Sequence, residues 1–229
     1  LRAVNREQPP LEMRVIVGKP DRPTPALQQD LKYLVFNPYW EVPEIIAVQD
    51  KLPELKRDPS RLAAQGLEAA PQTHGKENGV MTPVDQIDWR DVPADPFPYR
   101  LRQRPGPANP LGQLKFMLPN AQEVYLHDTP EVSLFNRCER SFSAGCVRVE
   151  NAIRLGEWLL QFQHEPWDRE RIETQITSKE TRTVVLDTRV PVFIVYFTSY
   201  GDDTGSLRFQ PDLYNGDQFI IDALHGAAP

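Results

Sequence analysis

Proline is the residue type that most constrains what this chain can fold into. The 229 residues contain 23 prolines and 12 glycines. Proline has no backbone N–H to donate and fixes its own φ angle, so it interrupts helices and is excluded from the middle of a sheet. This content argues against an all-helical bundle. It predicts short elements joined by rigid turns and extended connections.

Charge and hydrophobicity exclude several classes of partner. Hydrophobic residues make up 40% of the chain and charged residues 25%, which is typical of a globular protein with a sizeable core. The net charge of −6 gives no support for binding to nucleic acid or anionic lipid. No apolar stretch approaches the roughly 20 residues that span a bilayer. We therefore expect no nucleic-acid partner and no membrane span.

The pattern of elements predicts a β-rich domain with an insertion. Strand-like runs occupy residues 13–17 and 32–36, and they resume from residue 99 onward, with two helical segments between residues 152 and 177. Residues 41–97 differ, because they hold 11 acidic and 6 basic residues and are helical in places. We expect a mixed α+β, mostly β domain from residues 1–40 and 98–229, interrupted by a partly helical subdomain. Within that insertion, residues 67–95 are predicted to form a loop.

A thiol and an imidazole lie at two positions typical of strand ends. His127 ends an apolar run before a proline turn, and Cys146 follows a glycine turn shortly before a helix. Cysteine attacks as the thiolate, and a neighbouring histidine can accept its proton. Gly145 permits a tight turn, so backbone N–H groups around it could face a developing oxyanion. The alternative is an inert core cysteine and a structural histidine, which are the more common uses of these residues.

The cysteine content gives little sign of a metal or of disulfides. Cys138 and Cys146 are too few for a disulfide framework and lack the His/Cys spacing of a zinc site. We therefore expect no metal, and we expect Cys138 to face away from Cys146. The chain begins at Leu1 without a methionine, so we expect a piece from which any targeting segment has been removed.

One composite motif identifies a family. His127 followed by Ser143, Gly145, Cys146, Val147 and Arg148 closely resembles the signature of the L,D-transpeptidases, the YkuD-type cysteine enzymes that cross-link peptidoglycan. The segments 105–112, 115–116 and 125–130 look like the large Gram-negative members, which carry a capping subdomain inserted in the catalytic domain. The insertion at residues 41–97 falls where those proteins have their cap. Ala144 stands where many members have a second histidine, although the capped members are similar in lacking it.

The resemblance implies a fold and a set of site residues. The fold is a YkuD-like, β-sandwich or barrel-like catalytic domain with the capping subdomain. Cys146 is the nucleophile, His127 the general base, the backbone carbonyl of Asp128 orients the imidazole, and the backbone of Gly145 forms the oxyanion hole. The residues expected to bind substrate are Arg148, Ser143, Ala144, Tyr125 and Phe116. From chemistry alone, a structural ion pair suits Arg148 equally well, and a turn-forming role suits the Asp128 side chain.

The resemblance also implies an activity. Cys146 would attack the bond between the L-centre and D-alanine in a tetrapeptide stem, form a thioester, release D-alanine and transfer the acyl group to a second stem, giving a 3→3 cross-link. No cofactor is needed, the location is the periplasm, and carbapenems would acylate the same thiol. Two alternatives stay open: another acceptor (a lipoprotein lysine, a D-amino acid or water), or a non-catalytic peptidoglycan-binding module.

Overall fold

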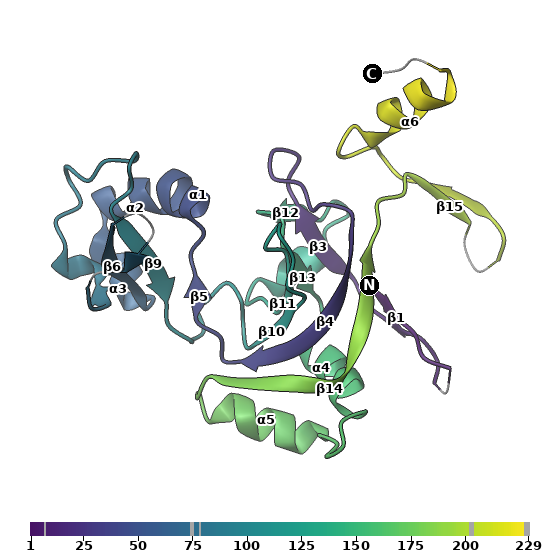
Figure 1. Ribbon diagram of the computed structural model, residues 1–229, viewed down its shortest axis with the longest axis horizontal. Coiled ribbons are helices and arrows are strands. Elements are labelled where there is room, and N and C mark those ends of the chain that lie inside the picture. The colour runs from purple at the N-terminus through teal and green to yellow at the C-terminus, as the bar shows by residue number, and fades with distance from the viewer. Residues whose placement is uncertain (7, 74–75, 78, 202–203, 227–229) are drawn as a thin grey trace.

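The computed structural model in Figure 1 describes residues 1–6, 8–73, 76–77, 79–201 and 204–226. The chain is mixed α+β and mostly sheet, which confirms the predicted class. Within the described ranges, no helix combines the length and the apolar character needed to cross a bilayer.

A seven-stranded sheet forms the centre of the main domain, with the strand order β12-β3-β13-β11-β10-β4-β14. These strands cover Ser141–Ser143 (β12), Val15–Gly18 (β3), Val147–Val149 (β13), Leu126–His127 (β11), Leu114–Met117 (β10), Leu27–Phe36 (β4) and Arg182–Ile194 (β14). β11 and β13 run parallel, whereas β10 is antiparallel to β11 and to β4. A separate two-stranded ribbon joins Arg2–Ala3 (β1) and Leu11–Glu12 (β2).

Two helices complete the main core. Ala152–Leu160 (α4) and Arg169–Thr177 (α5) each begin at a side-chain cap, since Asn151 accepts from the Arg154 N–H and Asp168 from the Arg171 N–H. Gly156 of α4 faces the sheet, and a Cβ at this position would be in ordinary contact with Leu114 Cδ1 at 3.6 Å. The buried cluster beneath the helices includes Leu34, Phe36, Leu114, Phe116, Leu126, Val147, Leu155 and Ile172. A short 3-10 turn, Val132–Asn136 (η3), precedes β12.

A second, smaller unit has its own core and stands apart from the large sheet in Figure 1. Its strands are Trp40–Glu41 (β5), Leu67–Thr73 (β6), Lys76–Glu77 (β7), Thr82–Pro83 (β8) and Tyr99–Gln103 (β9). Its helical turns are Glu44–Ile46 (α1), Ala47–Lys51 (η1), Leu52–Arg57 (α2), Pro59–Ala64 (α3) and Val84–Gln86 (η2). Its core includes Trp40 and Leu101, so the packed unit extends beyond residues 41–97 on both sides.

The prediction of a loop over residues 67–95 was wrong for its first part. Residues Leu67–Thr73 form β6, which pairs along its length with β9. Alanine, glutamate and proline are poor strand formers in isolation, but pairing with an existing strand and burial of Ala69 and Ala70 outweigh that preference. The predicted loop also covers residues 74–75 and 78, which lie outside the described residues.

The C-terminal segment extends away from both units (Figure 1). It holds a hairpin of Ser199–Gly201 (β15) and Leu207–Phe209 (β16), followed by the helix Gly216–Leu224 (α6). Phe197, Phe209 and Phe219 are exposed on it. The Tyr214 hydroxyl donates a hydrogen bond to the carbonyl of Gly18 at 2.8 Å, which ties this segment to the end of β3.

Candidate active site

Three neighbouring strands separate polar from apolar side chains. Phe116 of β10 pairs with Leu126 of β11, and Leu126 pairs with Val147 of β13; all three belong to the core. Because side chains alternate along a strand, the residues beside them point to the opposite face. That face receives Lys115, Tyr125, His127, Cys146 and Arg148.

Phe116, expected at the substrate groove with core packing as the alternative, packs in the core and does not line the groove. Its side chain is 0% exposed and packs in the core of the main domain. The reason is register, since Phe116 is one residue along β10 from the position that pairs with His127. A one-residue step in a strand moves a side chain to the other face.

Cys146 opens onto a groove of about 800 Å³ between the two units. The main domain contributes Lys115, Glu123, Tyr125, Ala144, Gly145 and Cys146, and the smaller unit contributes Glu41, Val42, Pro43 and Ile45. The thiol of Cys146 lies 3.8 Å from the carbonyl oxygen of Glu123. Tyr125 and Ala144, expected at the site, thus line the same groove as the thiol.

The surroundings of Cys146 keep it protonated at rest. Burial raises the pKa of the thiol above its ordinary value, while hydrogen bonds from the Tyr125 backbone and hydroxyl and the nearby Lys115 ammonium lower it in part. Burial also raises the pKa of Tyr125, so that hydroxyl remains a donor. A base must therefore take the proton from Cys146 before or during attack on a substrate.

The surroundings of His127 keep its imidazole neutral and fix its tautomer. Its side chain is 4% exposed, and its Nδ1 lies 2.5 Å from the carbonyl oxygen of Asp128. A carbonyl only accepts, so Nδ1 carries the hydrogen and Nε2 keeps its lone pair. Burial lowers the pKa of His127 to about 3, against the opposing hydrogen bond to Asp128. The imidazole is consequently uncharged at neutral pH.

The parallel register relates the imidazole to the thiol. His127 of β11 pairs with Arg148 of β13, and Tyr125 and Cys146 each stand one residue before these two strands. The Val147 N–H donates to the Tyr125 carbonyl at 3.0 Å. The ring centroids of Tyr125 and His127 lie 5.7 Å apart, so Tyr125 relates the start of β13, next to Cys146, to the imidazole.

The Asp128 side chain supports the turn before β10. Its carboxylate accepts the Gln113 N–H at 2.9 Å. Gly112 has a φ of 59°, and a Cβ there would lie 2.3 Å from Asp128 Oδ2. The carboxylate thus forms part of the turn, while the carbonyl of the same residue contacts His127.

The loop carrying Cys146 is held by hydroxyl groups. Ser143 Oγ donates to the Cys146 carbonyl at 2.5 Å and accepts the Gly145 N–H at 3.1 Å. Thr24 Oγ1 donates to the Gly145 carbonyl at 2.7 Å. Gly145 has a φ of 115°, which an L side chain rarely adopts. The Gly145 N–H is therefore engaged inside the loop and does not face the groove as the oxyanion-hole expectation required.

Two expected substrate contacts have structural partners instead. Ser143 is buried and bonds within its own loop. Arg148 forms an ion pair with Glu131, and neither Ser143 nor Arg148 lines the groove. Of the two roles considered for Arg148, the structural ion pair is the one observed. Cys138 is exposed, forms no disulfide and does not line the groove.

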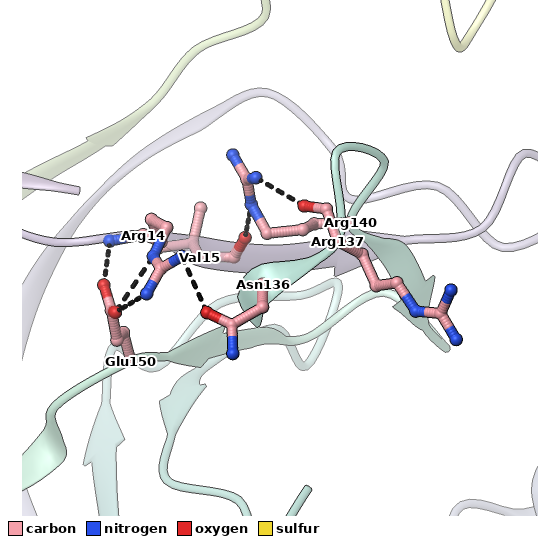
Figure 2. Close-up of polar contacts among 6 residues, drawn as sticks. All are labelled: Arg14, Val15, Asn136, Arg137, Arg140 and Glu150. Carbon is pink, nitrogen blue, oxygen red and sulfur yellow. Dashed lines mark hydrogen bonds and ion pairs between the residues drawn. The ribbon is translucent and has the colours of Figure 1, made fainter. Parts of the chain in front are cut away.

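A polar network holds both ends of the segment that carries Cys146. Figure 2 shows Arg14, next to β3, between Glu150 and Asn136, with a 2.9 Å bond from Arg14 Nε to Glu150 Oε1. In the same view, Arg140 bonds the carbonyls of Val15 and Arg137. These contacts join β3 to both ends of the segment 136–150, so the Cys146 loop starts and finishes at fixed points.

Lys115 is the site residue that sequence reasoning missed. It lines the groove, pairs with His127 across the strands, and its Nζ lies 3.9 Å from the ring centroid of Tyr125. The alternation Leu114-Lys-Phe-Met117 shows that Lys115 and Phe116 face opposite ways. Only the pairing of β10 with β11 shows that the lysine shares the face of His127.

The site thus combines a thiol that opens onto a groove lined by both units with a buried neutral imidazole on the adjacent strand. Residues 1–194 match the YkuD family, the L,D-transpeptidase catalytic domain. The chain belongs to this family. The match ends at the last residue of β14, before the C-terminal hairpin.

A curated relative gives the same family. A Haemophilus influenzae protein named "Putative L,D-transpeptidase" is 37% identical over 210 residues, which is 92% of this chain and 41% of that protein. The chain thus spans less than half the length of this relative.

Proposed function

We propose that this chain is the catalytic unit of a peptidoglycan L,D-transpeptidase, with Cys146 as nucleophile and His127 as general base. One observation carries the proposal. The Asp128 carbonyl holds Nδ1 of a neutral His127, which frees Nε2, and His127 lies on the strand beside β13, which directly follows the groove-lining Cys146. A binding module needs neither group.

The first half-reaction forms a thioester. Nε2 of His127 takes the Cys146 proton as the sulfur attacks the carbonyl carbon of the bond between the L-centre and D-alanine in a tetrapeptide stem. The C–N bond then breaks, the imidazolium returns the proton to the departing nitrogen, and D-alanine leaves. Because the resting thiol and imidazole are both neutral, proton transfer accompanies attack rather than preceding it.

The second half-reaction transfers the acyl group. The amine of a second stem attacks the thioester, His127 accepts a proton from that amine, and Cys146 leaves as the thiolate and is reprotonated. The product is a 3→3 cross-link. For the oxyanion of both steps we assign the Cys146 N–H, since Gly145 donates to Ser143 and the Cys146 N–H has no acceptor among the described residues.

The smaller unit acts as the cap in this proposal. Glu41, Val42, Pro43 and Ile45 line the groove across from the main-domain residues. A cap that covers the bound stem keeps water from the thioester, since hydrolysis competes with transfer. These steps use only groups of the chain itself and no metal or organic cofactor. The substrate places the enzyme outside the cytoplasm, in the periplasm.

Intact-mass measurement after incubation with a carbapenem tests the proposed nucleophile. We expect one adduct on the unmodified reduced protein and on Cys138→Ala, and none on Cys146→Ala. Cys138→Ala is the matched control because it removes the other thiol of the chain. An unmodified protein that stays free of adduct would favour the peptidoglycan-binding module.

Product analysis tests the acceptor. Purified tetrapeptide muropeptides should give a 3→3 linked dimer and free D-alanine. Release of D-alanine without dimer, or dimer replaced by an adduct with an added lysine peptide or D-amino acid, would assign the same thioester chemistry to another acceptor.

A further inference from the structure

The groove contains one ammonium group. Among the described residues that line it, Lys115 is the one cationic side chain. Two carboxylates, Glu41 and Glu123, line the same groove and act on the lysine charge without forming an ion pair with it. Glu41 is instead paired with Arg100 at 2.8 Å. The lysine ammonium therefore keeps its hydrogen-bond donors for an anionic ligand.

Packing fixes the ammonium close to the reacting groups. Its Nζ stands over the Tyr125 ring, 3.9 Å from the centroid, and that ring centroid is 5.7 Å from the centroid of His127. Tyr125 also hydrogen-bonds the thiol of Cys146. A cation held on an aromatic face loses little further freedom when it binds an anion.

Burial is costly for an ammonium that has no direct ion-pair partner. Burial lowers the pKa of Lys115, and the ionised form of Cys146 and the carboxylates of Glu41 and Glu123 oppose this only in part. A polar group kept at such a cost on a ligand-facing surface is a common mark of a binding function. An incoming carboxylate would both recover the lost solvation and form a charge-assisted hydrogen bond.

We propose that Lys115 forms a subsite for the terminal carboxylate of the leaving residue, so that the enzyme cleaves only the last peptide bond of the donor stem. This inference rests on the proposed function. In such a donor the carboxylate carbon lies three covalent bonds from the scissile carbonyl carbon, or about 4 Å. The attacking sulfur lies about 3–3.5 Å from that same carbon. The carboxylate therefore falls beside the nucleophile, where Lys115 is placed.

The test compares two donors that differ in one charge. A tetrapeptide ending in D-alanine and its C-terminal carboxamide are assayed for release of the last residue. For the unmodified protein we expect kcat/KM to be about 10- to 100-fold higher with the free carboxylate, as for other hydrogen bonds between charged groups. Lys115→Met should abolish this preference by lowering kcat/KM for the carboxylate donor alone, and Lys115→Arg should restore part of it.

Lys51→Met is the matched control. Lys51 also lies over an aromatic ring, 5.8 Å from that of Trp40, but it does not line the groove. Its substitution should leave the preference between the two donors unchanged. Thermal unfolding of each variant establishes that the compared proteins are folded.

Three results would overturn the subsite. One is equal kcat/KM for the two donors with the unmodified protein. Another is an equal loss on both donors in Lys115→Met, which would mean that the ammonium acts on the thiol and not on the carboxylate. The third is the same loss of preference in Lys51→Met. A carbapenem adduct on Cys146 of the unmodified protein in any of these cases would leave the proposed function standing, whereas its absence would remove both.

Discussion

The two faces of strands β10, β11 and β13 are built from the same backbone but serve opposite purposes. One face carries Phe116, Leu126 and Val147, which pack beneath the helices of the main domain. The other carries His127, which is buried, and Lys115, which is partly buried beside the groove. The core face gains stability from apolar burial.

The comparison teaches that a site can be inserted into a sheet without disturbing its core. Polar burial on the site face costs stability, and the core face offsets it. Substitutions on the two faces should therefore have different effects. Those on the site face should alter chemistry or the pH dependence of stability, and those on the core face should alter stability alone.

His127→Gln should give the largest effect and sharpen the comparison. The glutamine amide has no basic lone pair, so formation of the thioester at Cys146 should slow by about 10²- to 10⁴-fold, the usual range for a general base. Mass spectrometry of acyl-enzyme against time measures the rate. A decrease of less than tenfold would mean that another group takes the thiol proton.

Phe116→Ala should lower the stability that the core face provides. Truncating a fully buried phenylalanine removes its transfer energy and leaves a cavity, so we expect a loss of about 3–5 kcal/mol in the free energy of unfolding. Urea denaturation measures it, with Phe116→Leu as a control that retains more of the volume and loses less. If Phe116→Ala instead raised KM at unchanged stability, Phe116 would belong to the groove.

Acid should destabilise the protein through the site face. The folded-state pKa of His127, about 3, lies below the unfolded value. As pH falls below about 6.5, the unfolded chain binds a proton that the folded chain does not, so stability decreases as pH falls. Between pH 6.5 and 4.5 this amounts to about 2–3 kcal/mol, at about 1.4 kcal/mol per pH unit.

Urea denaturation at several pH values tests this linkage. His127→Gln has no imidazole at this position, so its stability should fall less steeply over the same interval. Parallel curves for the two proteins would show that His127 does not carry the acid sensitivity.

Thr24→Val should give the smallest effect, at the loop that borders the site face. The Thr24 hydroxyl donates to the Gly145 carbonyl and accepts the Gly18 N–H at 2.9 Å. Losing both bonds should cost about 1–2 kcal/mol. Thr24→Ser keeps the hydroxyl and should retain most of the stability. A loss in Thr24→Ser as large as that in Thr24→Val would mean that the two hydroxyl hydrogen bonds do not account for the effect.

Cys146 and His127 could be chosen as site candidates from the sequence because each stands in a short, continuous stretch of the motif. The sequence could not show that Lys115 faces the site and Phe116 the core. Alternation places the two side chains on opposite faces of β10, but it does not say which face carries His127. That choice depends on the pairing of β10 with β11, which is a contact between distant segments.

Two further features, β6 and the direction of the Gly145 N–H, could not be predicted from the sequence for different reasons. β6 has weak strand propensity and exists through its pairing with β9. The Gly145 N–H is withdrawn from the groove by a hydroxyl two residues earlier, a contact set by loop geometry alone. Gly145 was expected to permit the turn, and its φ of 115° agrees with that. The expectation failed for its N–H, which donates to Ser143 and not into the groove.

The Gly112 and Asp128 contact has a consequence for the design of variant libraries. Any side chain at position 112 would displace the carboxylate of the residue whose carbonyl holds His127. The residues at positions 112 and 128 must therefore change together, and a library that randomises position 112 alone would mostly disturb the contacts of Asp128. A library that is to preserve the imidazole should keep both codons fixed and place its diversity on the cap side of the groove.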